Sequence, residues 1–261
     1  HDFQTYAAWK HKTGTYIHIT KFSDIGANQN TPTVVKDHIL DAYNTWENPP
    51  THVLIVGDDG VAPVKYITYD YTFVYENYFV ELEGNDYFPE MLIGRFTNQG
   101  DYRMRVMINK FIGYEKDPYI ADPDWFRKGL TCSNDAYISQ IYTKRETAEQ
   151  MMMNGNFISV DSMYNGYPCQ GNVNDIKNMI NEGRSFLNYR GEGWSSGWWA
   201  SCFPFGTSDV NQLNNGQKLT FVTSIGCGVA MFDANGGNCF GEAFVQLGAE
   251  FEPRGACAFV G

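Results

Sequence analysis

The chain has 261 residues, 43% of them hydrophobic, which is enough to bury a core as one large α/β domain or as two adjoining subdomains. Its 30 acidic residues outnumber its 19 basic residues, and the net charge of −11 repels phosphate backbones and anionic membranes at long range. We therefore expect no nucleic acid partner. No run approaches the roughly 20 apolar residues that span a bilayer, so we also expect no membrane span.

The first part of the chain is typical of an α/β unit. Its apolar spacing predicts a strand over 14–20, a helix over 33–46, a strand over 51–56, loop and short strands over 66–83, a strand over 90–94 and a helix over 101–114. Thr31 and Pro32 support the start of the first helix. The first three elements make a βαβ unit, which implies parallel pairing.

The second part repeats this alternation after a linker with two Asp-Pro pairs, at Pro118 and Pro123. We place an N-terminal α/β subdomain over residues 1–118 and a C-terminal subdomain over 119–261. The expected strands are 128–132, 157–163, 185–189, 219–225 and 256–260, and the expected helices are 139–153, 172–181 and 240–247. This order predicts an α/β fold with a mostly parallel sheet and helices on both faces.

Two of the later strands end at a reactive side chain between two glycines. Residues 185–189 lead into Glu192, and residues 219–225 lead into Cys227. Open α/β sheets bind their ligands at the carboxyl ends of parallel strands, so both side chains are expected at one active-site rim. A cysteine at the end of a strand in this rim is typical of a nucleophile, and its base is expected at the end of the neighbouring strand, which is the position of Glu192.

At these residues the chain resembles the gingipain family of cysteine peptidases, relatives of caspases, whose signature is His-Gly after one strand and Cys after the next. Four further segments match family landmarks in the family order: Thr51–Asp58, Gly84–Arg95, Tyr114–Pro118 and Asn238–Phe244. The resemblance is most distinctive over residues 50–261. It implies a caspase-like fold with two side-by-side subdomains, cleavage of protein or peptide substrates by a cysteine nucleophile, and no required cofactor.

The base position departs from the family pattern, because this chain has Glu192 where the family has histidine. All five histidines lie in the first 52 residues. Two of them, His38 and His52, are expected at the end of the sheet opposite the rim, so we do not expect a histidine to replace the missing base. A carboxylate gives the thiol no cationic partner, and its negative charge makes the thiolate scarcer. A buried glutamate could still act as a base.

Three functions follow from this departure. The first is a cysteine endopeptidase with activity weakened or lost through Glu192. The second is an inactive pseudopeptidase that serves as a secreted binding or scaffold protein. The third is a cysteine and carboxylate site used for transpeptidation or another acyl transfer.

The expected catalytic residues are Cys227 as nucleophile and Glu192 at the base position. Backbone N–H groups near Gly193 or Gly228 could stabilise the oxyanion. The resemblance also implies an acidic residue that assists the pair, and Asp135 lies near that position. A solvated loop aspartate is an equally good interpretation of Asp135.

The substrate cleft is expected to be lined by Trp194, Trp198 and Gly228, on the segments that follow the two reactive residues. Aromatic side chains there indicate a hydrophobic or stacking subsite, although ordinary core tryptophans are as good an interpretation. Gln140 falls near the position where arginine-specific relatives hold their specificity carboxylate. Since glutamine is neutral, arginine specificity is not expected.

A short acidic stretch supplies oxygen ligands from Glu81, Glu83, Asn85 and Asp86. Gingipain relatives bind structural calcium, so the resemblance implies a calcium site with Glu81, Glu83 and Asp86 as ligands. The spacing is not that of an EF-hand, and an acidic loop that simply faces water is the alternative.

The six cysteines leave five beside Cys227, so at most two internal disulfides can form. Cys239 and Cys257 stand in apolar surroundings and are expected to be buried free thiols. The chain has 17 tyrosines, 18 phenylalanines and few lysines, a balance typical of secreted bacterial proteins. We expect a secreted or cell-surface protein whose export signal is absent from this chain.

Overall fold

The computed structural model describes residues 2–97, 100–165, 169–234 and 237–261. By its internal contacts the chain divides into two compact units, His1–Met104 and Arg105–Gly261. Each unit is described by itself. The division at residue 118, expected from the Asp-Pro linker, stays a prediction.

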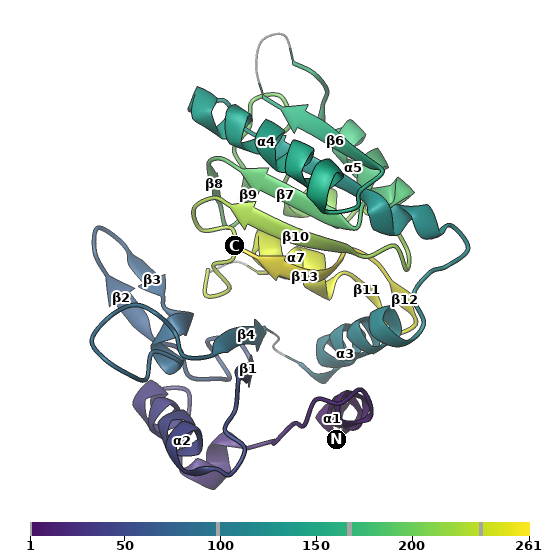
Figure 1. Cartoon of the computed structure of the whole chain (residues 1–261). Coiled ribbons are helices and arrows are strands. Elements are labelled where there is room, and N and C mark those ends of the chain that lie inside the picture. Colours follow the sequence, from purple (N-terminus) through teal and green to yellow (C-terminus); the bar gives the residue numbers. More distant parts are fainter. Residues whose placement is uncertain (1, 98–99, 166–168, 235–236) are drawn as a thin grey trace. The chain divides into compact units, whose positions relative to one another are not determined.

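The first unit combines short helices with two small sheets (Figure 1). Its elements are α1 (Asp2–Lys12), η1 (Phe22–Ile25), α2 (Pro32–Thr45), β1 (His52–Val56), β2 (Tyr66–Thr68), β3 (Thr72–Val74), η2 (Glu76–Phe79) and β4 (Leu92–Phe96). Strands β1 and β4 are parallel, with Val56 opposite Phe96, whereas β2 and β3 form an antiparallel hairpin.

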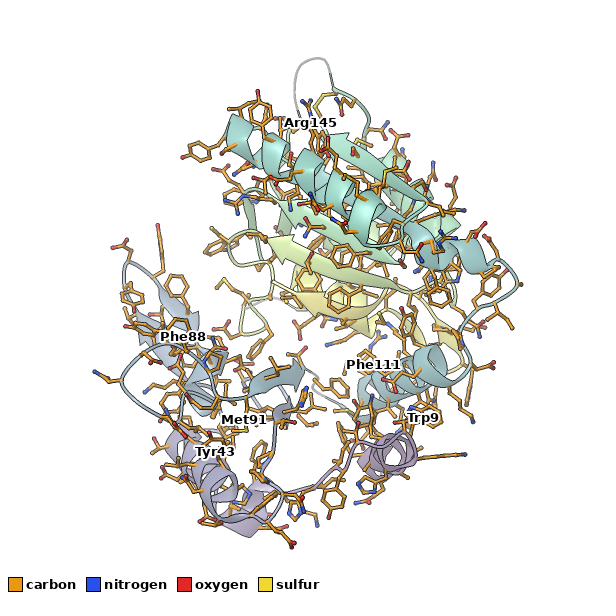
Figure 2. All side chains as sticks on the ribbon, in the orientation of Figure 1. Trp9, Tyr43, Phe88, Met91, Phe111 and Arg145 are labelled. Atoms are coloured by element: carbon orange, nitrogen blue, oxygen red, sulfur yellow. A yellow bond between two sulfur atoms is a disulfide. The ribbon has the colours of Figure 1, made fainter. Side chains whose placement is uncertain are left out.

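The core of the first unit lies between α2 and the β1–β4 pair. Val35 and Ile39 of α2 pack with Ile55 of β1 and with Met91, and all four side chains are buried. Tyr43, labelled with Met91 in Figure 2, packs against the same cluster. The helical spacing of these apolar residues explains why the sequence predicted α2 correctly.

Two expectations for the first unit are wrong. Residues 14–20 form no strand, so the parallel partner of β1 is β4 rather than the segment before α2. The alternation in 14–20 has no neighbouring strand to pair with, and the His11 ring instead accepts the backbone N–H of Ile17 at 2.8 Å. Helix α1 was not expected, because its apolar residues form no clear stripe.

The second unit contains the parallel sheet that the sequence predicted. Its strands are β5 (Lys128–Ser133), β6 (Ser159–Tyr164), β7 (Phe186–Arg190), β10 (Thr220–Ile225) and β13 (Ala256–Val260), in the spatial order β13-β10-β7-β5-β6 (Figure 1). Every neighbouring pair in this sheet is parallel. The strand positions expected from the sequence are confirmed to within two residues.

Helices and short strands complete the second unit. They are η3 (Pro123–Arg127), α4 (Ile138–Asn154), α5 (Val173–Glu182), β8 (Gly193–Trp194), β9 (Gly197–Trp198), α6 (Thr207–Val210), α7 (Phe240–Gln246), β11 (Gly248–Ala249) and β12 (Glu252–Pro253). Figure 1 shows α4 on one side of the five-stranded sheet and α7 on the other. This arrangement agrees with the predicted helices on both faces.

The main core of the second unit lies on the face of the sheet that α5 and α7 cover. Leu130, Leu187 and Val222 are in register on β5, β7 and β10, and each is fully buried. They pack in one cluster with Ile176 of α5 and Phe240 of α7. Burial of each such side chain contributes roughly 1.5–3 kcal/mol, so this layer holds the strands in a fixed register.

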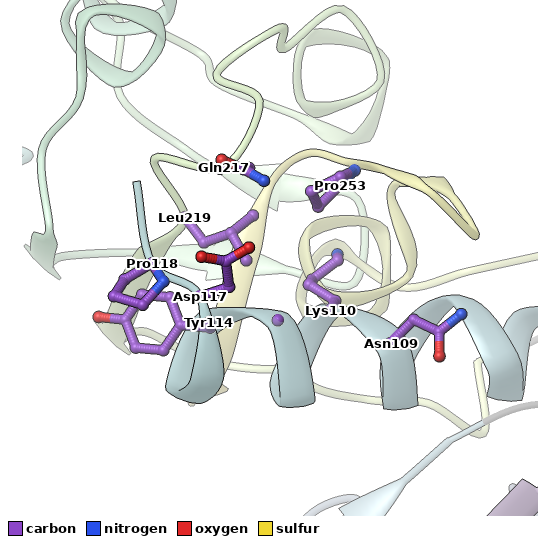
Figure 3. A pocket seen from close by; sticks show the side chains of 9 residues that line it. Asn109, Lys110, Tyr114, Asp117, Pro118, Gln217, Leu219 and Pro253 are labelled. Carbon is purple, nitrogen blue, oxygen red and sulfur yellow. The ribbon is translucent and has the colours of Figure 1, made fainter. Parts of the chain in front are cut away.

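Helix α3 (Asp101–Lys116) crosses the division between the units, and its later turns bond within the second unit. Lys110 Nζ donates to the carbonyl of Val245 at 2.7 Å, and Asn109 Nδ2 donates to that of Glu250 at 3.3 Å. A small pocket remains between α3, Leu219 and Pro253 (Figure 3). Its volume of about 30 Å³ holds little more than a water molecule, so it cannot accept a peptide.

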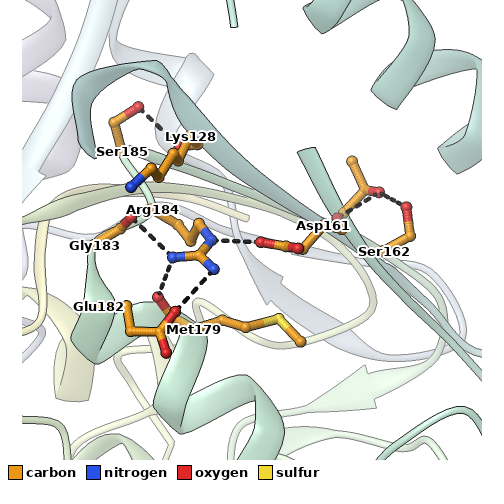
Figure 4. Close-up of polar contacts among 9 residues, drawn as sticks. Lys128, Asp161, Ser162, Met179, Glu182, Gly183, Arg184 and Ser185 are labelled. Carbon is orange, nitrogen blue, oxygen red and sulfur yellow. Dashed lines mark hydrogen bonds and ion pairs between the residues drawn. The ribbon is translucent and has the colours of Figure 1, made fainter. Parts of the chain in front are cut away.

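The amino ends of the strands are held by a buried arginine. Arg184, just before β7, forms an ion pair with Asp161 of β6 at 2.6 Å and a second with Glu182 at 3.2 Å (Figure 4). The same guanidinium donates to the carbonyls of Met179 and Gly183. These contacts fix the edge of the sheet opposite the predicted rim.

Within the part of the chain that the structure describes, we find no helix with the length and apolar character needed to cross a membrane.

Candidate active site

The turns that carry Cys227 and Glu192 lie against one another. Strands β10 and β7 are in register up to Ile225 and Arg190, and Gly191 N donates to the carbonyl of Ile225 at 3.0 Å. A Cβ added to Gly226 would stand only 3.0 Å from the carbonyl oxygen of Gly191. Glycine at residue 226 therefore favours this close approach of the two backbones, since a side chain there would push the Gly191 carbonyl away by a few tenths of an ångström.

Cys227 is an exposed free thiol at the carboxyl end of β10, and Glu192 is exposed at the carboxyl end of β7. Next to them, Gly228 adopts the left-handed conformation, with φ of 64°. A Cβ at Gly228 would come within 3.0 Å of the Trp194 ring and 2.9 Å of the Met231 sulfur. The turn after Cys227 therefore requires glycine, for its conformation and for the close approach of Trp194.

Two aromatic residues buried in the core, Tyr189 and Trp198, hold the turn that carries Glu192. The Tyr189 hydroxyl donates to the carbonyl of Glu192 at 2.7 Å, and its ring stacks on Trp198 with centroids 4.2 Å apart. Trp198 Nε1 in turn donates to Ser224 Oγ at 2.9 Å, three residues before Cys227. Burial, with the charges of Cys132 and Glu192, raises the pKa of Tyr189 well above its usual value, so this hydroxyl stays a neutral donor.

The predicted cleft tryptophans have different environments. Trp198 is 2% exposed and belongs to the core, which is the alternative that the sequence left open. Trp194 is 38% exposed and Trp199 is 58% exposed, so both can contact a ligand at the rim. Contact of Trp194 with substrate stays a prediction.

Asp135 follows β5, on the strand next to β7, and its side chain is exposed. Asn165, which follows β6, donates through Nδ2 to Asp135 and to Ser201 Oγ, while its Oδ1 accepts from Cys202 N at 2.7 Å. A disulfide joins Cys202 to Cys169. Sequence reasoning did not single out Asn165, although a polar residue directly after a predicted strand was an available signal.

Three buried polar atoms near the carboxyl end of β5 have no hydrogen-bond partner among the described residues. They are Ser133 Oγ, Asn134 Oδ1 and Gln140 Oε1. Gln140, which the sequence placed in the cleft, lies in the first turn of α4 and is 8% exposed. Because buried polar groups are almost always paired, water or a ligand is expected to reach these atoms.

A buried lysine lies one turn further along α4. Lys144 Nζ donates to Asn188 Oδ1 on β7, and Asn188 Nδ2 donates to Thr223 Oγ1 on β10. Burial and the nearby Arg190 charge lower the pKa of Lys144 to about 8. This chain of contacts, which the sequence did not predict, joins α4 to the two strands that carry Glu192 and Cys227.

The remaining free cysteines are unsuited to nucleophilic chemistry. Cys132, Cys239 and Cys257 are all buried, as expected for Cys239 and Cys257. Burial raises the pKa of Cys239 to about 12 and that of Cys257 to about 11, so both stay protonated. All six cysteines belong to the described residues, and among them Cys227 is the only exposed free thiol.

The second unit contains no histidine, because all five lie in the first 52 residues of the sequence. The rings of His11, His18 and His38 contact neighbours within the first unit. A histidine base from the second unit is therefore excluded, and Glu192 at the base position stays a prediction.

The predicted calcium ligands are engaged with other groups. Glu81 and Glu83 accept hydrogen bonds from the hydroxyls of Tyr75 and Tyr43, and Asp86 accepts a backbone N–H. Among the residues that the structure describes, no three histidine, cysteine, aspartate or glutamate side chains gather as a metal site. Structural calcium stays a prediction.

A parallel α/β sheet with an exposed cysteine and an adjoining carboxylate at its carboxyl edge is the arrangement expected of a cysteine-dependent α/β hydrolase. The whole chain, residues 1–261, matches the model of Peptidase family C25. The chain belongs to this family.

The similar proteins and structures agree with this assignment. The chain is 26% identical to Gingipain R2 of Porphyromonas gingivalis over 99% of its own length, and 26% identical to Lys-gingipain of the same organism over 97%. It spans 34% of the former and 14% of the latter. The crystal structure of the Arg-specific cysteine proteinase gingipain R matches with a TM-score of 0.87 at 24% identity, over 99% of this chain and 59% of that one. The expected gingipain resemblance and fold class are confirmed.

Proposed function

We propose that this chain provides the nucleophile and cleft of a cysteine endopeptidase, with Cys227 attacking peptide bonds and Glu192 at the base position. The observation that carries the proposal is the exposed free thiol of Cys227 against the turn of Glu192. Family membership supports the reaction class, and protein or peptide substrates follow from it. No metal or organic cofactor enters the chemistry.

The proposed reaction proceeds through an acyl-enzyme. The thiol proton passes to the Glu192 carboxylate while Cys227 Sγ bonds to the peptide carbonyl carbon. Backbone N–H groups near Gly193 or Gly228 are proposed to stabilise the resulting oxyanion. The C–N bond then breaks as Glu192 returns the proton to the leaving amine. Water, deprotonated by Glu192, hydrolyses the thioester and regenerates the thiol.

Glu192 makes this chemistry slower than a histidine would. Histidine becomes a cation when it takes the proton and so stabilises the neighbouring thiolate, whereas glutamate becomes neutral and does not. Glu192 is also exposed, so its carboxylate is not shielded from water. We therefore propose weakened proteolysis.

The test is cleavage of a mixed peptide library by the parent chain, Glu192→His and Cys227→Ala, with calcium and a mild thiol reductant. Slow cleavage by the parent that disappears in Cys227→Ala and increases in Glu192→His supports the proposal. Cleavage that survives in Cys227→Ala would exclude Cys227 as the nucleophile.

The second candidate is a pseudopeptidase that binds peptides without turnover, and Glu192 in place of histidine favours it. A silent parent beside an active Glu192→His variant would establish it. The Cys169–Cys202 disulfide supports an oxidising compartment, so we place the protein outside the cytoplasm, secreted or at the bacterial surface. Structural calcium at Glu81, Glu83 and Asp86 is part of the same proposal.

A further inference from the structure

The β2–β3 hairpin and the loop after it expose large aromatic side chains in the first unit. The exposed fractions are 70% for Tyr69, 67% for Tyr71, 74% for Tyr87 and 77% for Phe88. Figure 2 labels Phe88 beside this hairpin. Single exposed aromatic residues are ordinary, but a group of them marks an interaction surface. We name these four residues, together with Asp70, the tyrosine surface.

The members of the tyrosine surface are connected. The Tyr69 and Tyr87 side chains interact, which raises the pKa of the Tyr69 hydroxyl and relates the hairpin to the loop. At the hairpin tip, Tyr69 N donates to the carbonyl of Tyr71 at 3.0 Å, and Asp70 lies between these two residues in the turn. The Tyr71 ring also contacts Phe73, with centroids 6.4 Å apart. The aromatic groups therefore form one surface on a hydrogen-bonded hairpin rather than separate side chains.

The hairpin and the loop that carry the tyrosine surface contain acidic but no basic side chains. Residues 66–94 contain six carboxylates and no lysine, arginine or histidine. Five of these carboxylates already have partners: Glu76 pairs with Arg95, Glu81 and Glu83 accept tyrosine hydroxyls, and Asp86 and Glu90 accept backbone N–H groups. Asp70 is exposed at the hairpin tip and has no side-chain partner among the described residues.

Another tyrosine of the first unit shows how such rings bind cations. The ammonium groups of Lys36 and Lys65 lie over the Tyr78 ring, 4.5 Å and 4.9 Å from its centroid. Among the described residues, no lysine or arginine lies over Tyr69, Tyr71 or Tyr87. These rings are free to bind a cation from another molecule.

We propose that the tyrosine surface docks a flexible polypeptide segment that carries lysine or arginine side chains. The rings of Tyr69, Tyr71 and Tyr87 contact the cationic groups, and the carboxylate of Asp70 pairs with one of them. The one-signed charge favours such a segment over a neutral glycan, which would stack on tyrosines without needing carboxylates. This docking is independent of cleavage at Cys227.

The experiment measures binding of a fluorescent glycine-serine peptide with several lysines to the Cys227→Ala chain, so that cleavage cannot remove the peptide. The same peptide with glutamates in place of the lysines is the charge control. The test variants are Tyr69→Ala with Tyr71→Ala, and Asp70→Asn. Matched controls in the second unit are Tyr142→Ala, which is also exposed, and Asp124→Asn, which removes the same charge elsewhere.

The expected result is binding of the lysine peptide alone, weakened by added salt. The double tyrosine variant should bind roughly tenfold more weakly and Asp70→Asn roughly two- to fivefold, with both controls near the parent. If Asp70→Asn and Asp124→Asn lose the same amount of peptide affinity, net charge alone explains the effect, and the proposed site is overturned. Unchanged binding by the tyrosine variant, or salt-independent binding of a neutral oligosaccharide through these tyrosines, would also overturn the proposal.

Discussion

The hydroxyl of Tyr189 donates to the backbone carbonyl of Glu192 at 2.7 Å. A residue buried in the core therefore holds the turn that carries the base position. Because the Tyr189 ring also stacks on Trp198, which bonds to Ser224 of β10, the same core contacts set the spacing between the Glu192 and Cys227 turns.

Tyr189→Phe should lower kcat several-fold with little change in KM. The ring and its stacking are kept, so only the hydroxyl donor to Glu192 is lost, at a stability cost of about 1 kcal/mol. Steady-state kinetics and thermal unfolding measure the two effects. The kinetics are measured in the Glu192→His background, which is expected to be more active than the parent. An unchanged kcat would mean that the turn keeps its position without Tyr189.

Glu192→Gln should separate two roles of the Glu192 carboxylate, which are its negative charge near the Cys227 thiol and its ability to accept a proton. Removing the negative charge beside Cys227 should speed alkylation of its thiol by iodoacetamide a few-fold, because the thiolate becomes less unfavourable. Peptide cleavage should fall in the same variant, since the amide cannot take a proton. Cys227→Ala is the labelling control. Equal alkylation rates would show that Glu192 exerts no effective charge on the thiol.

Gly228→Ala should destabilise the protein and abolish cleavage, since its Cβ meets both Trp194 and Met231 in a left-handed conformation. Gly216→Ala is a matched control, because Gly216 has φ of 58° with open space around its Cβ position. The conformational strain of about 1–2 kcal/mol is common to both. Thermal unfolding should therefore show a larger loss of stability for Gly228→Ala than for Gly216→Ala. Similar losses would mean that the contact with Trp194 adds nothing to the conformational strain.

Lys144→Met should remove a pH-dependent part of the stability. The folded pKa of Lys144 is lowered to about 8 from 10.5, so between these values the unfolded chain binds more protons. The contribution of this group to stability therefore rises as pH increases from 8 to 10.5, by at most roughly 3 kcal/mol. Denaturant unfolding across that range should show the parent gaining stability relative to Lys144→Met. Parallel curves would contradict the lowered pKa.

Replacing Cys169 and Cys202 together by serine should cost roughly 2–4 kcal/mol of stability. It should also lower activity, because the bonded Cys202 segment holds Asn165, which contacts Asp135. Cleavage by the parent should for the same reason fall in strong reductant, while the double variant shows no such loss. Denaturant unfolding and rate measurements at two reductant concentrations test both effects.

Much of the second unit could be predicted from the sequence. The apolar runs at 185–189 and 219–225 are strands covered on both faces, and burial alone makes such runs recognisable. Parallel pairing then places both carboxyl ends at one edge, so the neighbourhood of Glu192 and Cys227 followed without coordinates. The first unit was less predictable, because the alternation in 14–20 carries no information on whether a neighbouring strand exists.

By itself, the sequence determined the family and the order of strands and helices along the chain, since these depend on residue identity and local apolar spacing; Glu192 at the family's histidine position stays a prediction. Only the tertiary structure decided which cysteines pair, that Trp198 supports the site from the core, and that Asn165 and Lys144 join it. These features depend on distances between residues far apart in the chain. Such distances are set by how side chains pack together, which local sequence patterns do not encode.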